Sequence, residues 1–214
     1  HTGDYEAWNL DKDAYGYLQG VWVRSEENPI DLSDEKSFLD YISNVDSACY
    51  ESDLKYFRWN TVLDFQGKDE TLLHTIADRK EHQPEAISYY KDASKTEKTD
   101  SCSNFGSLQA IKVVKRNQSG VILELELDFQ NGAVSVQSEY NMRAILGCGI
   151  TNINLLDGNS VEMSILPSAY ISIQAKGDGT YAVLGGGYGH GIGMSQNGAQ
   201  KLCGQGFDYK RILN

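Results

Sequence analysis

The stretch VILELELDFQNGAVSV, residues 121–136, decides the fold class of this chain. Up to residue 129 its side chains alternate, with Glu124, Glu126 and Asp128 on one face and apolar residues on the other. This period of two is typical of a β-strand. Asn131-Gly132 is a favoured pair for a tight turn. The stretch therefore predicts two antiparallel strands joined by a hairpin.

The segments around this stretch switch between the strand period and the helix period, which predicts an α+β fold with antiparallel sheets and flanking helices. The predicted strands are residues 20–24, 56–65, 108–115, 121–129, 133–136, 169–175 and 180–184. The predicted helices are residues 34–43, 69–81, 140–146 and 194–205, the first of them with Ser33 as its N-cap. Residues 91–104 are polar and aperiodic, and we expect a loop or an internal linker there.

The length of 214 residues favours one domain, residues 1–214, and is sufficient for a sizeable core. The formal net charge of −11 argues against nucleic acid or an anionic bilayer as the main partner, because both require a basic surface. A neutral sugar polymer or a cationic surface fits this charge better. The longest apolar runs are much shorter than the roughly 18 residues of a membrane-spanning helix.

The four cysteines, Cys49, Cys102, Cys148 and Cys203, are widely spaced and form no C-x-x-C pair. A zinc ribbon or a thioredoxin-like site is therefore unsupported. Two alternatives remain open from the spacing. The cysteines form two disulfides in an exported protein, or some of them are free thiols that pack as small hydrophobic residues.

The run GGGYGHGIGMSQNGAQKLCGQG, residues 185–206, contains the densest glycine cluster of the chain. Glycine permits a positive φ and lets backbone or ligand approach closely, so we expect His190 to face a cleft from a strand–loop–helix segment. The run contains neither a dinucleotide fingerprint nor a P-loop, and Ser195 is not in a G-x-S-x-G elbow. No second histidine follows His190 at metal-ligand spacing, so no metal and no cofactor are predicted. From the residues alone, a glycine-rich turn with a hydrogen-bonded histidine is the simplest interpretation.

Residues 187–200, GYGHGIGMSQNGAQ, closely resemble the signature G-x-G-H-G-V-G-M-S-Q-Y-G-A of the stage II sporulation protein D family, which includes the amidase enhancers. The family's trailing G-x-x-Y-x-x-I-L is similar to Gly206, Tyr209, Ile212 and Leu213. Weaker similarities precede the signature in the family order, at His1-Thr2, Glu6, Trp8, Tyr17-Leu18 and Asn141-x-Arg143. Asn197 stands where the family usually has tyrosine.

The resemblance implies a lytic transglycosylase, located in the cell envelope or secreted, that cuts peptidoglycan glycan strands whose stem peptides an amidase has removed. A carboxylic acid protonates the glycosidic oxygen, and its conjugate base helps the sugar's 6-hydroxyl close an anhydro ring. The family's acid lies in an N-terminal segment that has no counterpart in these residues. We therefore assign no catalytic residue, and expect a fragment that is inactive alone or acts with a separate N-terminal fragment. The alternative is a non-catalytic module that binds glycan or a partner amidase.

The resemblance also implies a set of substrate-binding or supporting residues. His190 would donate to a sugar hydroxyl, and Ser195 and Gln196 would lie at a helix N-terminus, where backbone N–H groups lack helical partners. Arg143 would orient a carboxylate through a bidentate pair. Tyr188, and with it Trp59, would stack on sugar rings, with core or rim packing as the alternative for each. A solvated surface position is the alternative for Arg143.

Overall fold

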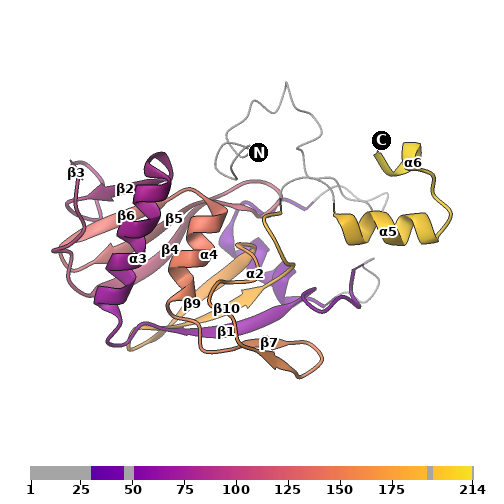
Figure 1. The fold of residues 1–214 in the computed structure, drawn as a ribbon, viewed down its shortest axis with the longest axis horizontal. Helices are drawn as coiled ribbons and strands as arrows, with labels where there is room; N and C mark the ends of the chain where they lie inside the picture. Colours follow the sequence, from indigo (N-terminus) through magenta and orange to yellow (C-terminus); the bar gives the residue numbers. More distant parts are fainter. Residues whose placement is uncertain (1–29, 46–50, 192–194, 214) are drawn as a thin grey trace.

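The structure, a computed structural model, describes residues 30–45, 51–191 and 195–213. Two antiparallel five-stranded sheets form its centre (Figure 1). Sheet A has the order β8 (Ser160–Val161), β7 (Ile153–Leu155), β1 (Trp59–Asp64), β10 (Thr180–Gly185) and β9 (Ile171–Gly177). Sheet B has the order β3 (Lys98–Thr99), β2 (Ile87–Tyr90), β6 (Gly132–Val136), β5 (Ile122–Phe129) and β4 (Leu108–Arg116).

The helices are α2 (Glu35–Ser43), α3 (Asp69–His82), α4 (Glu139–Gly147), α5 (Gln196–Gly204) and α6 (Tyr209–Leu213), with a short 3-10 helix, η2 (Pro84–Ala86). Helices α3 and α4 lie side by side over sheet B, whereas α5 and α6 lie beyond the edge of both sheets (Figure 1). Asp34 caps α2 by accepting hydrogen bonds from the backbone N–H groups of Lys36 and Ser37. The cap prediction at Ser33 is therefore wrong by one residue.

The predicted α+β class with antiparallel sheets and flanking helices is confirmed. The four predicted helices correspond to α2, α3, α4 and α5, and the six predicted strands after residue 50 correspond to β1, β4, β5, β6, β9 and β10. The strand predicted at residues 20–24 lies outside the described residues. Short elements were missed, namely β2, β3, β7, β8, η2 and α6. Residues 91–104 are not a free linker, because they contain β3 and the buried Cys102.

One hydrophobic core joins the two sheets. Leu63 and Val183 contribute from sheet A, and Leu125 and Leu127 contribute from sheet B. Helix α3 adds Leu72 and Ile76, and α4 adds Met142, Ile145 and Leu146. All of these side chains are at most 1% exposed, so the inner faces of both sheets and both helices are packed together in a single core.

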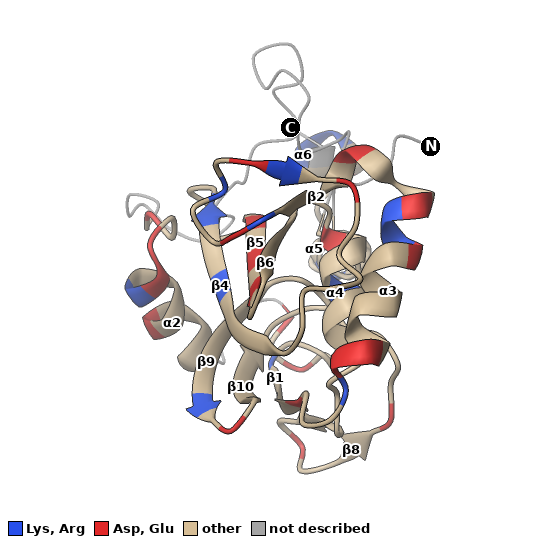
Figure 2. Cartoon of the chain, turned by 90° about the vertical axis from the view of Figure 1, so that its left-hand side faces the viewer, with Lys and Arg blue, Asp and Glu red and all other residues tan. Residues whose placement is uncertain are grey.

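The acidic face of β5 is also covered, because Glu126 and Asp128 are only 5% and 7% exposed. In Figure 2 acidic positions colour part of β5 red, and β4, with blue positions of lysine or arginine, lies beside it. Lys95 Nζ lies 2.9 Å from Glu124 and 2.8 Å from Glu126, and Lys112 pairs with Asp128. Burial alone would lower the pKa of Lys95, but the carboxylates of Glu126 and Glu124 outweigh it and raise the pKa. Partly buried ion pairs therefore neutralise this face.

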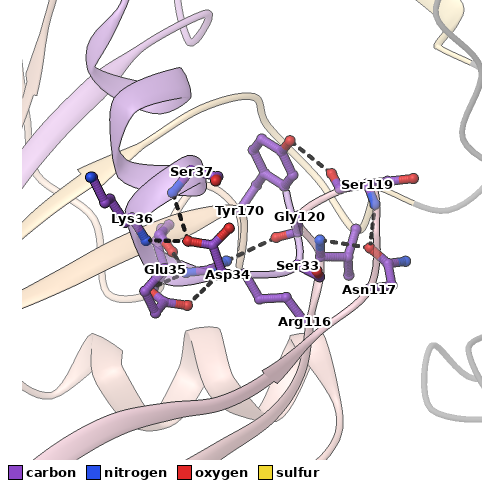
Figure 3. A network of polar contacts seen from close by, with 12 residues as sticks. Ser33, Asp34, Glu35, Lys36, Ser37, Arg116, Asn117, Ser119, Gly120 and Tyr170 are labelled. Atoms are coloured by element: carbon purple, nitrogen blue, oxygen red, sulfur yellow. Dashed lines mark hydrogen bonds and ion pairs between the residues drawn. The ribbon is translucent and has the colours of Figure 1, made fainter. Parts of the chain in front are cut away.

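Arg116, at the end of β4, connects α2 to both sheets through a side chain that is 0% exposed (Figure 3). Its guanidinium donates to both carboxylate oxygens of Glu35, the first residue of α2. It also donates to the carbonyl oxygen of Gly120 at 2.8 Å and to that of Ile171 in β9 at 2.7 Å. The ring of Phe38 lies 3.7 Å from the guanidinium carbon. A planar group with several fixed donors is required to make these contacts together.

We expect Arg116→Lys to lower the free energy of unfolding by about 2–3 kcal/mol, because a lysine cannot serve the carboxylate and both carbonyls at once. Urea unfolding measures this change. The control is Lys115→Met on the same strand, where the exposed side chain predicts a change within about 0.5 kcal/mol. Equal stability of the two variants would contradict the central role of Arg116.

Candidate functional site

The candidate site lies where the chain enters β1 and leaves β10. These strands are antiparallel neighbours, with Trp59 opposite Gly185. In such a pair the start of one strand lies beside the end of the other. Residues 51–58, before β1, and the glycine run after β10 therefore meet at the same end of these two neighbouring strands of sheet A.

Backbone hydrogen bonds fix the first part of the glycine run. The N–H of Gly187 donates to the carbonyl oxygen of Tyr56 at 2.8 Å, and the N–H of Gly189 donates to that of Pro167 at 2.9 Å. Gly189 has φ +113°, a value that favours glycine over residues with a side chain. The chain is thus held on both sides just before His190.

Trp59 explains why position 185 is glycine. A Cβ at this position would lie 2.2 Å from the Trp59 ring, so the indole packs directly on the Gly185 backbone. The indole N–H donates to the carbonyl oxygen of Gly187 at 3.1 Å, and Trp59 is 2% exposed. The expectation that Trp59 stacks on sugar rings is therefore wrong, because this side chain is part of the core.

Tyr188 and His190, by contrast, are exposed; exposure was predicted for His190, whereas the sequence left Tyr188 open between sugar stacking and core or rim packing. Tyr188 is 65% exposed, and its ring lies 4.8 Å from that of Tyr56, at 32° between the planes. His190 is exposed, and its two neighbours, Gly189 and Gly191, carry no side chains that could cover it. The loop thus presents an aromatic face and an imidazole to solvent on an anchored backbone.

Ser195 connects the start of α5 to an acidic residue to which the sequence assigns no role. Its hydroxyl accepts a hydrogen bond from the N–H of Gly198 at 3.0 Å, which caps the helix, and donates to a carboxylate oxygen of Glu51. Lys201, farther along α5, pairs with Asp53. The segment before β1 therefore contacts the first two turns of α5, and a carboxylate lies at a helix N-terminus, where the helix dipole favours negative charge.

Gln196, the first residue of α5, is exposed beside Ser195. Arg143 lies in α4, with a side chain that is 11% exposed. It pairs with Glu139 at 3.2 Å and donates to the carbonyl oxygen of Leu166 at 2.8 Å. Leu166 precedes Pro167, whose carbonyl oxygen accepts the hydrogen bond from the N–H of Gly189. Arg143 therefore supports the glycine run through the backbone and does not present its guanidinium at the surface.

The sequence gives no local signal for Glu51 or Tyr56, because both reach the site only through the pairing of β1 with β10. Ser195 and Glu51 are 144 positions apart. The single sequence feature that could have found them is the predicted strand at residues 56–65, if its partner strand had been known.

Several other expectations concern thiols, metals and membranes. Cys102, Cys148 and Cys203 are free thiols, which excludes the alternative of two disulfides, while Cys49 lies outside the described residues. Within residues 30–45, 51–191 and 195–213, no group of three or more histidine, cysteine or acidic side chains is arranged to hold a metal ion. Among the helices in these same ranges, none combines the length and the apolar character that crossing a bilayer requires.

A family model described as a domain of unknown function, DUF8618, matches residues 3–193. The match includes Glu51, Tyr56, Tyr188 and His190 and ends before Ser195. No curated protein and no solved structure matches the chain.

We expect Gly185→Ala to lower the free energy of unfolding by about 1–3 kcal/mol, because the new methyl group overlaps the Trp59 ring. Thermal and urea unfolding measure the change. Gly204→Ala in α5 is the matched control, since a Cβ added there would meet no atom within 4 Å, and alanine is expected to be neutral or stabilising. A neutral Gly185→Ala would contradict the packing of the indole on this strand.

Proposed function

We propose that this chain, which belongs to the DUF8618 family of domains of unknown function, binds the glycan strand of peptidoglycan at the glycine-loop site. We define this site as Glu51, Tyr56, Tyr188, His190 and Ser195. The observation that carries the proposal is the exposed Tyr188 ring, which packs at a tilt against Tyr56 in a loop whose backbone is hydrogen-bonded to Tyr56 and to Pro167.

The chemistry of the site suits a sugar polymer. An exposed tyrosine supplies a flat apolar face with a polar end, which matches the C–H face and the hydroxyls of a sugar ring. His190 and Gln196 add side chains that can exchange hydrogen bonds with hydroxyl or acetamido groups. The net charge of −11 disfavours a nucleic acid as the ligand, because nucleic acid requires a basic surface.

Peptidoglycan is proposed from the resemblance of residues 187–200 to the stage II sporulation protein D signature. On this proposal the chain acts outside the cytoplasm, in the cell envelope or as a secreted protein, on strands from which an amidase has removed the stem peptides. An amidase is thus a functional partner, and a separate N-terminal fragment is a second proposed partner.

Glycan cleavage is the second candidate function, and it rests on the carboxyl group of Glu51, which contacts Ser195 at the start of α5. Glu51 is half-buried and places a carboxyl group in a site that was expected to lack one. As the acid, Glu51 would give its proton to the glycosidic oxygen while the bond from that oxygen to C1 breaks. The carboxylate would then take the proton of the 6-hydroxyl as O6 bonds to C1, which forms an anhydro sugar without consuming water.

We expect Tyr188→Ala to weaken binding to stem-peptide-free glycan strands about tenfold, because the sugar loses its stacking face. Calorimetric titration of soluble strands measures the affinity, and the melting temperature of each variant reports its folding. Tyr140→Ala, an exposed tyrosine on α4, is the control and keeps full affinity. Loss of affinity in both variants, or in neither, would refute the site.

For cleavage, we expect Glu51→Gln to abolish release of anhydro-sugar fragments from stem-peptide-free strands while glycan binding stays within about threefold, because the amide keeps the shape of the acid but cannot supply its proton. Mass spectrometry of the digest measures the products. Asp53→Asn is the control, since it removes the neighbouring carboxylate that pairs with Lys201. If the unaltered chain binds strands but releases no product, the chain is the binding module and the cleavage candidate fails.

A further inference from the structure

A recess lies away from the glycine-loop site, between α3 and residues 100–103. Its volume is about 540 Å³, within the range of roughly 300–1,000 Å³ that is usual for small-molecule sites. Leu73 and Ala77 of α3, Tyr89 of β2 and Cys102 contribute the apolar part of its lining. None of these residues belongs to the glycine-loop site.

The apolar part of the lining carries no charge near neutral pH. Tyr89 and Cys102 are 4% and 3% exposed, and burial raises the pKa of the Tyr89 hydroxyl and of the Cys102 thiol. Both groups therefore keep their protons. The thiol contacts the carbonyl oxygen of Leu73 at 3.8 Å. The lining thus accepts an apolar group and offers no thiolate or phenolate.

The rim, by contrast, is acidic. Glu70 and Glu81 of α3 and Asp100 of the facing segment line the recess, and all three are exposed. Within the part of the chain that the structure describes, none of these carboxylates forms an ion pair. His74 and the hydroxyls of Ser101 and Ser103 also line the recess.

Lys80 lines the same recess and sets one positive charge against the three carboxylates, so the rim keeps an excess of negative charge. The Lys80 ammonium donates to the carbonyl oxygens of Pro84 at 3.2 Å and Ile87 at 2.6 Å. It also lies 5.1 Å from the centre of the Tyr89 ring. The lysine thus stabilises the turn between α3 and β2, and the recess combines an apolar surface with three carboxylates and one ammonium.

We propose that this recess binds a small organic cation, a primary ammonium attached to a short alkyl or aryl-alkyl group. The apolar part lies against Leu73, Ala77 and Tyr89, and the ammonium lies among the carboxylates of Glu70, Glu81 and Asp100. Charge complementarity selects a cation over an anion of the same shape. The apolar lining selects an organic ammonium over an inorganic ion.

The probes are three ligands of similar shape: phenethylammonium, the neutral 2-phenylethanol and the anion 3-phenylpropionate. Titration is followed by two-dimensional amide NMR of the whole chain. Phenethylammonium is expected to give saturable shifts at residues of α3 and residues 100–103, and its affinity is expected to fall as salt is raised. The anion is expected to give no saturable shift. Equal binding of anion and cation, or shifts centred on other elements, would overturn the proposal.

The matching variant is Glu70→Gln/Glu81→Gln/Asp100→Asn, which is expected to weaken phenethylammonium at least about tenfold. The control is Asp40→Asn/Glu162→Gln/Asp178→Asn, which changes the net charge equally at exposed positions outside the recess. All six side chains are exposed, so the folds are expected to persist, and the amide spectra verify this. Equal weakening in both variants would show a general charge effect and overturn the site.

Discussion

The buried guanidinium of Arg116 is the constraint on which the arrangement of the two sheets depends. A charge with no exposed surface is tolerated only when a counter-ion and hydrogen-bond acceptors surround it. Here Glu35 of α2 is the counter-ion, and carbonyl oxygens of Gly120 and of Ile171 in β9 are acceptors. One side chain of sheet B thereby fixes the edge strand of sheet A and the helix beside it.

The glycine-loop site depends on that arrangement. Strand β9 pairs with β10, and β10 pairs with β1. The position of β9 therefore also fixes the end of β10, where the glycine run begins. The loop itself is held by backbone hydrogen bonds and by Trp59, which leaves Tyr188 and His190 exposed on a fixed support. Exposed functional side chains on an ordered scaffold are the usual arrangement of binding loops.

Acidic side chains have two different roles in this structure. On β5, Glu126 and Asp128 are buried and paired with lysines, which stabilises an otherwise costly covered face. Glu51 at the glycine-loop site is half-buried, and Glu70 and Glu81 around the recess beside α3 are exposed, so all three are more accessible to solvent than Glu126 and Asp128. The first group belongs to the architecture, whereas the second group is available to a ligand. The two groups consist of the same residue types and differ in solvent exposure and in their pairing with lysines.

The sequence by itself determined the α+β class, most of the long strands and helices, and the exposure of His190. These features follow from local periodicity and from glycine's missing side chain, which any short window of sequence contains. Strands of two or three residues, such as β3, β7 and β8, are too short to show a period. Only the tertiary structure decided that Trp59 is core, that Arg143 supports the loop through Leu166, and that Glu51 meets Ser195. The reason is that contacts between distant residues depend on which strands pair, and periodicity within each strand leaves that pairing open.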